Sequence, residues 1–117
     1  MGEDPAKTLR AVFYRTSGGR EPVREWLKSF PPEDRFTIGI DIKTVEFGWP
    51  IGMPTCRSLG GGIWEVRSDL SGGRIARVLF SIQRNEMYLL NGFIKKTQKT
   101  PLQEIELARQ RLREIAQ

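Results

Sequence analysis

Three stretches with strand-like patterns, separated by short turns, constrain most strongly how this chain can fold. Residues 62–70 (GIWEVRSDL) alternate apolar and polar side chains, so Glu65 and Arg67 share one face of a strand. The turns SGG and QRNE then separate two further stretches, residues 74–82 (RIARVLFSI) and 87–94 (MYLLNGFI). Because tight turns join antiparallel neighbours, this segment predicts an antiparallel meander.

Helical patterns flank the meander. Residues 9–15 (LRAVFYR) predict a short strand, and residues 21–30, 33–48 and 100–117 predict helices from their apolar spacing and their proline positions. The order β-α-α-β-β-β-α indicates an α+β fold: a small twisted antiparallel sheet packed by the helices on one face, with the other face partly open. At 117 residues, the whole chain (1–117) is expected to form a single domain.

Composition excludes several kinds of site. The chain has no histidine, which excludes Ser-His-Asp and Cys-His catalysis, and it has no Cys/His cluster for a metal, so we expect no cofactor. Its single cysteine, Cys56, excludes an internal disulfide and suits a reducing cytoplasm. Cys56 ends a proline-rich stretch, residues 48–56 (GWPIGMPTC), that predicts a loop. No apolar run reaches the roughly 18 residues of a membrane span, so we expect a cytoplasmic protein.

Positive charge is concentrated in the second half of the chain. Residues 1–56 contain eight Lys/Arg and eight Asp/Glu, whereas residues 57–117 contain eleven against six, which accounts for the net charge of +5. Such a bias fits a polyanionic partner, of which nucleic acid is the commonest. A basic surface that only keeps the protein in solution explains the charge equally well.

The most basic stretch comes where the last strand of the meander ends. In residues 91–101 (NGFIKKTQKTP), Lys95, Lys96 and Lys99 follow the apolar strand directly. We expect these lysines to lie at the rim of the open sheet face. The polar side chains expected on that face are Glu65, Arg67 and Arg77. A cationic face that also holds a carboxylate is a plausible place for a phosphate backbone.

The order of these motifs resembles a known family. The segments LGGGIWEVRSDLSGGRIARVLFSI and MYLLNGFIKKTQKTPLQEIELARQRL are similar to the HigB-type, phage-derived branch of the RelE/ParE toxin superfamily. The resemblance covers about the last half of the chain, and the first half agrees in its layout of one strand and two helices. It implies a RelE-like fold and the toxin of a type II toxin–antitoxin system. Many relatives cleave mRNA in the ribosomal A site, and the HigB branch commonly pairs with a helix-turn-helix antitoxin.

The resemblance and the chemistry of RNA cleavage together suggest roles for individual residues. Cleavage without a metal needs a base for the 2′-hydroxyl, positive charge for the phosphorane and an acid for the leaving 5′-oxygen. Arg67 and Arg77 suit the second need, and Glu65 is the candidate base. Lys96 lies close enough to the strand end to reach the scissile phosphate. The residues expected to hold RNA phosphates are Lys95, Lys99 and Arg74.

Each assignment has a structural alternative. Arg67 could pair with Glu65 or Asp69, Arg77 could belong to a structural ion pair, and the lysines could form a solvated loop. Relatives that cleave RNA often use a tyrosine or histidine near the C-terminal part of the site, whereas the last tyrosine here is Tyr88. Three functions therefore stay open: an mRNA endoribonuclease that inhibits translation on the ribosome, a non-catalytic inhibitor of DNA gyrase, and an inactive homologue that acts through antitoxin or DNA binding.

Overall fold

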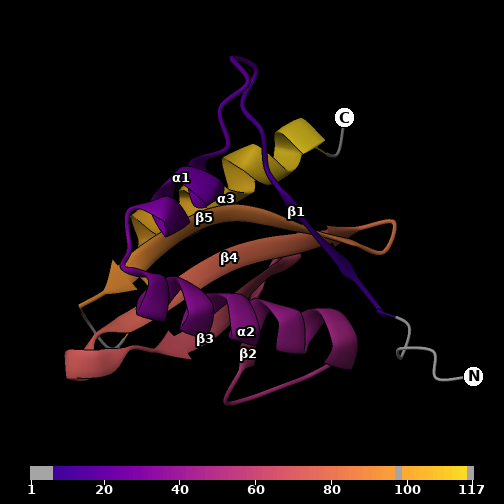
Figure 1. Ribbon diagram of the computed structural model, residues 1–117. Helices are drawn as coiled ribbons and strands as arrows, with labels where there is room; N and C mark the ends of the chain where they lie inside the picture. The colour runs from indigo at the N-terminus through magenta and orange to yellow at the C-terminus, as the bar shows by residue number, and fades with distance from the viewer. Residues whose placement is uncertain (1–6, 97–98, 116–117) are drawn as a thin grey trace, which may run out of the picture.

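The computed structural model describes residues 7–96 and 99–115 (Figure 1). The elements in chain order are β1 (Arg10–Phe13), α1 (Pro22–Lys28), α2 (Pro32–Gly48), β2 (Cys56–Gly60), β3 (Ile63–Asp69), a 3₁₀ turn (Ser71–Gly73), β4 (Ile75–Gln83), β5 (Glu86–Lys95) and α3 (Leu102–Ile115). The α+β fold class expected from the sequence is confirmed. In the described part of the chain, no helix is long and apolar enough to span a membrane.

Five strands form one sheet in the order β1-β5-β4-β3-β2. The meander is confirmed: β3 pairs antiparallel with β4, and β4 pairs antiparallel with β5. The sheet is mixed, however, because β1 pairs parallel with β5, with Arg10 opposite Glu86. A parallel pair needs a long crossover between its strands, and the segment that contains α1, α2 and the other strands supplies one.

The sequence did not reveal the edge strand β2. Its first residue, Cys56, was expected to end a loop, but it lies opposite Val66 in an antiparallel pair with β3. The letters CRSLG carry no β-branched or aromatic residue, so no strand pattern is visible in them. Pairing with β3 therefore sets the conformation of β2.

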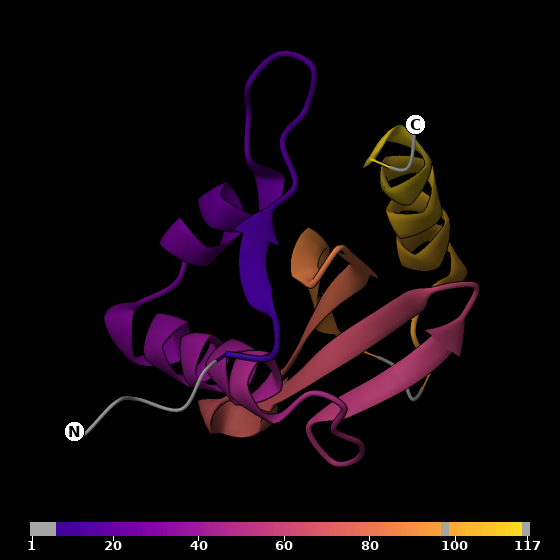
Figure 2. The same ribbon diagram turned by 90° about the vertical axis from the view of Figure 1, so that its right-hand side faces the viewer.

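The helices cover both faces of the sheet, as Figure 2 shows. Ile38 and Val45 of α2 belong to the same buried cluster as Phe80 of β4. Ala108 of α3 belongs to a second cluster, with Leu79 and Leu90. The expectation that all helices pack on one face is therefore wrong for α3.

The reason lies in β4, whose middle is buried on both sides. Residues 76–81 are all buried, and successive side chains of a strand point to opposite faces. A strand that is apolar on both faces needs cover on both. α1 and α2 cover one face, and α3 covers part of the other, which leaves the end of that second face near Arg67 and Arg77 for the candidate site.

Candidate functional site

A cationic groove lies on the sheet face that α3 covers only in part. It has a volume of about 710 Å³. The residues that line it are Arg57, Arg67, Gly73, Ile75, Arg77, Lys95 and Lys96. Strand pairing brings these side chains together, because Arg67 lies opposite Arg77 and Lys95 lies opposite Ile75. The structure thus gathers Arg67, Arg77, Lys95 and Lys96, as the sequence suggested. Lys95 is the last residue of β5 and is buried, however, so its expected place at the rim is wrong.

Glu65 lies beneath the groove as a shared counter-charge. Its side chain is fully buried, and its Oε1 accepts a hydrogen bond of 3.1 Å from Nη1 of Arg67. Nε of Arg77 is 3.9 Å from the same oxygen, and the hydroxyl of Thr100 donates to Oε2 at 2.8 Å. Both oxygens are thus engaged, and Glu65 is not among the groove-lining residues. This geometry favours a role in positioning the arginines, while its assignment as a general base stays a prediction.

Arg77 is buried next to another positive charge, and one of its donors lacks a hydrogen bond to any described residue. Its side chain is only 3% exposed, and its Nη1 donates to the carbonyl oxygen of Ala76 at 2.9 Å. Among the described residues, its buried Nε finds no hydrogen-bond partner. Burial, together with the positive charge of Arg67, lowers the pKa of Arg77. Guanidinium groups remain charged in proteins, so Arg67 and Arg77 repel each other. An anion entering the groove would relieve this repulsion.

Lys95 is buried, unlike Lys96 and Lys99. It is buried at the end of β5, with 8% of its surface exposed. Burial, followed by the nearby positive charge of Arg77, lowers its pKa from the usual value of 10.5. A lysine with a lowered pKa is better suited to proton transfer than an exposed one. Its neighbour Lys96 is exposed at the edge of the same groove.

The rest of the lysine stretch borders a second, smaller hollow. Thr97 and Gln98 lie outside the described residues. Lys99 is exposed and lines a hollow of about 230 Å³ together with Arg57, Leu59, Thr100 and Ile105. Because Arg57 lines both depressions, the hollow adjoins the groove.

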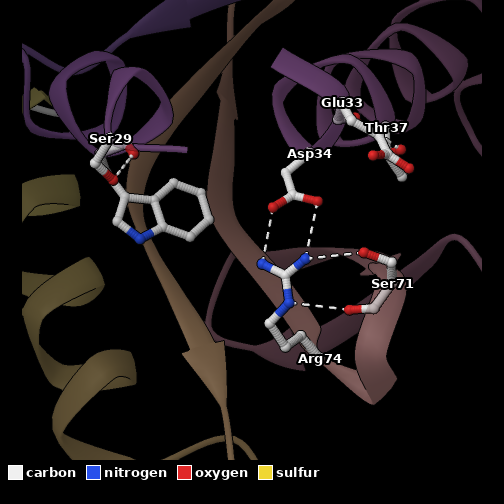
Figure 3. Close-up of polar contacts among 7 residues, drawn as sticks. Ser29, Glu33, Asp34, Thr37, Ser71 and Arg74 are labelled. Atoms are coloured by element: carbon white, nitrogen blue, oxygen red, sulfur yellow. Dashed lines mark hydrogen bonds and ion pairs between the residues drawn. The ribbon is translucent and has the colours of Figure 1, made fainter. Parts of the chain in front are cut away.

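Arg74, expected to bind RNA, is engaged with α2 instead of lining the groove. Its Nη1 and Nη2 donate to the buried carboxylate of Asp34 at 2.8 and 3.0 Å, and its Nε donates to the carbonyl oxygen of Ser71 at 2.9 Å (Figure 3). This fork ties the Ser71–Gly73 turn to α2, and Gly73 forms part of the groove wall. The geometry favours a structural role, and RNA binding by Arg74 stays a prediction.

Arg57 is a groove residue that sequence reasoning missed. It lies on β2 directly opposite Glu65 of β3, and its side chain is exposed. Recognising β2 as the strand that precedes the WEVR strand would have placed it on the same face. Neither tyrosine lines the groove: Tyr14 donates to Glu114 of α3, and Tyr88 donates to Glu86.

The family model for phage-derived Gp49-like proteins (DUF891) matches residues 25–113, about three quarters of the chain. The matched range includes α2, the whole meander and nearly all of α3, and therefore every residue that lines the groove. No curated protein matches the sequence.

Proposed function

From its membership of the Gp49-like family of phage-derived proteins, a toxin-like family of toxin–antitoxin systems, we propose that this chain is the toxin of a type II pair and inhibits translation by cutting mRNA on the ribosome. The cationic groove is the observation that carries this proposal. It places two arginines and a buried lysine side by side on one sheet face.

The groove suits a phosphodiester that gains negative charge during cleavage. Arg67 and Arg77 supply two guanidinium groups, which bind phosphate oxygens in a planar fork. Glu65 offsets only part of the surrounding positive charge, since Arg57 and Lys95 also line the groove. An incoming phosphate is therefore attracted before reaction, and the phosphorane is stabilised more strongly because it carries more charge.

The proposed reaction is an in-line attack within the RNA. The 2′-oxygen forms a bond to phosphorus while the bond from phosphorus to the 5′-oxygen breaks. The ammonium group of Lys95 gives a proton to the leaving 5′-oxygen, and the proton of the 2′-hydroxyl passes to water in the open groove. The products are a 2′,3′-cyclic phosphate and a 5′-hydroxyl end. This proposal exchanges the roles that the sequence suggested for the two lysines, because Lys95 is buried in the groove and Lys96 is exposed at its edge. Lys96 therefore holds a neighbouring phosphate.

A second function is favoured by one feature of the same groove. Among the described residues, its lining contains cations but no tyrosine, histidine or carboxylate, which are common groups for proton transfer. A toxin that binds phosphates without cutting them, as an inhibitor of DNA gyrase would, needs only the cations. This alternative predicts DNA breaks and intact mRNA.

The family implies an antitoxin, and the groove suggests how it acts. We expect a helix-turn-helix antitoxin with an acidic segment that covers the groove. Because charge complementarity acts mainly on encounter, the association rate should fall steeply as salt increases, while a rate independent of salt would contradict this.

Induction of the toxin in growing cells without its antitoxin tests the proposal. We expect growth arrest, with new 5′-hydroxyl ends inside translated mRNA. Arg77→Ala, checked for folding by thermal melting, should abolish both effects. Growth arrest with intact mRNA and DNA breaks would support the gyrase alternative instead.

A further inference from the structure

The small hollow beside the cationic groove differs from it in chemistry. Its volume of about 230 Å³ is a third of the groove's 710 Å³. Leu59 of β2 and Ile105 of α3 give it apolar walls, whereas the groove is lined mostly by cations. Arg57 stands between the two depressions and lines both.

We propose that this hollow receives the base of one nucleotide of a single-stranded RNA whose adjoining phosphate lies in the groove. The inference rests on the proposed function, because it takes RNA as the groove's ligand. The apolar side chains of Leu59 and Ile105 contact the base, and the exposed guanidinium of Arg57 stacks on it. Unpaired bases are commonly bound in this way, by stacking on the plane of an arginine.

The mixed chemistry of the hollow explains why a base occupies it. A phosphate is better served by the groove, where Arg67, Arg77 and Lys95 lie. A purely apolar ligand would make no favourable interaction with the charge of Arg57. A nucleobase combines a flat apolar face with an attached phosphate backbone, and so matches both sides of Arg57.

The hollow is also held in shape before any ligand arrives. Thr100 at its edge donates to the buried Glu65, which fixes the start of α3 against β3. The turn between β2 and β3 lies beside α3 (Figure 2). A Cβ on Gly62 in this turn would lie 3.8 Å from Leu112 of α3. Leu59 packs against the buried cluster that includes Ala108. A preformed site loses less free energy to ordering when it binds.

The test compares two short ligands on the purified protein. One is a single-stranded RNA trinucleotide with 2′-O-methyl groups, which prevent cleavage. The other is the same backbone with its bases removed, which keeps the phosphates. Dissociation constants are measured by titration followed by NMR. We expect the wild type to bind the ligand with bases at least about fivefold more tightly than the abasic one, because stacking on a base adds affinity that phosphates cannot supply.

Variants of the lining residues test whether the preference for the ligand with bases arises in the hollow. Leu59→Ala and Ile105→Ala change lining residues from two different elements, β2 and α3. Either variant that folds, as judged by thermal melting, should bring the ratio of the two dissociation constants close to one. Leu102→Ala is the matched control: Leu102 is an exposed apolar residue of α3 outside the hollow, and its variant should keep the wild-type ratio.

The outcomes separate this inference from the proposed function. Equal binding of the two ligands by the wild type, or a ratio unchanged in both wall variants, would overturn the hollow as a base site. A protein that shows the ratio but never cuts mRNA would keep the base site and refute the cleavage.

Discussion

Replacing Glu65 by glutamine separates two explanations of this buried carboxylate. Glutamine has nearly the same shape, and its amide oxygen can still accept the hydrogen bond from Thr100. The substitution removes the negative charge that Arg67 contacts at 3.1 Å and Arg77 approaches at 3.9 Å. A carboxylate that holds cations in place should then be needed for stability, whereas a general base should be needed for cleavage alone.

The burial of the two arginines indicates how much stability Glu65→Gln should lose. Removing one partner of a buried ion pair costs about 3–5 kcal/mol, because the other charge is left buried and unpaired. The side chain of Arg77 is 3% exposed, whereas that of Arg67 is 21% exposed. Solvent therefore reduces the cost of leaving Arg67 unpaired. We therefore expect Glu65→Gln to lower the free energy of unfolding by about 3 kcal/mol, the low end of that range.

Urea unfolding of the wild type and Glu65→Gln measures this difference. The double variant Glu65→Gln/Arg77→Met provides the control, because it also removes the positive charge of Arg77, which Glu65→Gln leaves buried without a counter-charge. The double variant should therefore regain part of the lost stability. If Glu65→Gln unfolds at the wild-type urea concentration but no longer cleaves RNA, the positioning role is wrong and the sequence-based assignment as general base is supported.

Three further changes test other parts of the account. If Lys95 protonates the leaving oxygen, the cleavage rate should decline as pH rises through the pKa of Lys95, which lies below the ordinary 10.5. Lys95→Arg should lack this decline. A wild-type rate that stays level up to pH 10.5 would contradict the role of Lys95 as an acid. Arg74→Ala should lower the urea midpoint without changing the salt dependence of RNA binding, whereas a shallower salt dependence would show that Arg74 contacts phosphate. Gly92→Ala should lower the free energy of unfolding by about 1–3 kcal/mol in urea, because its Cβ would lie 2.5 Å from Cε3 of Trp26; an unchanged midpoint would contradict the tight contact of α1 with β5.

The meander and much of the groove could be predicted because both follow from local rules. Turn residues mark where the strands end, and alternation puts Glu65 and Arg67 on one face. Strand pairing then adds Arg77, and the end of the last strand adds Lys95 and Lys96. None of these steps needs knowledge of distant contacts.

The remaining features depend on tertiary contacts that no local pattern encodes. β2 is a strand because β3 pairs with it, so Arg57 could not be placed. The amphipathic pattern of α3 shows that it packs, but not on which face of the sheet. Glu65 alternates like an exposed residue, yet it is buried beneath Arg67 and Thr100.

The most direct test of the central claim is the rate of mRNA cleavage by purified protein on ribosomes that carry a defined mRNA. The wild type should generate a fragment with a 5′-hydroxyl end. Folded Arg67→Ala and Arg77→Ala should each cleave about a hundredfold more slowly or worse, as expected when a group that stabilises transition-state charge is removed. No cleavage by the wild type, or cleavage at the wild-type rate by both variants, would contradict the assignment of the groove as an active site.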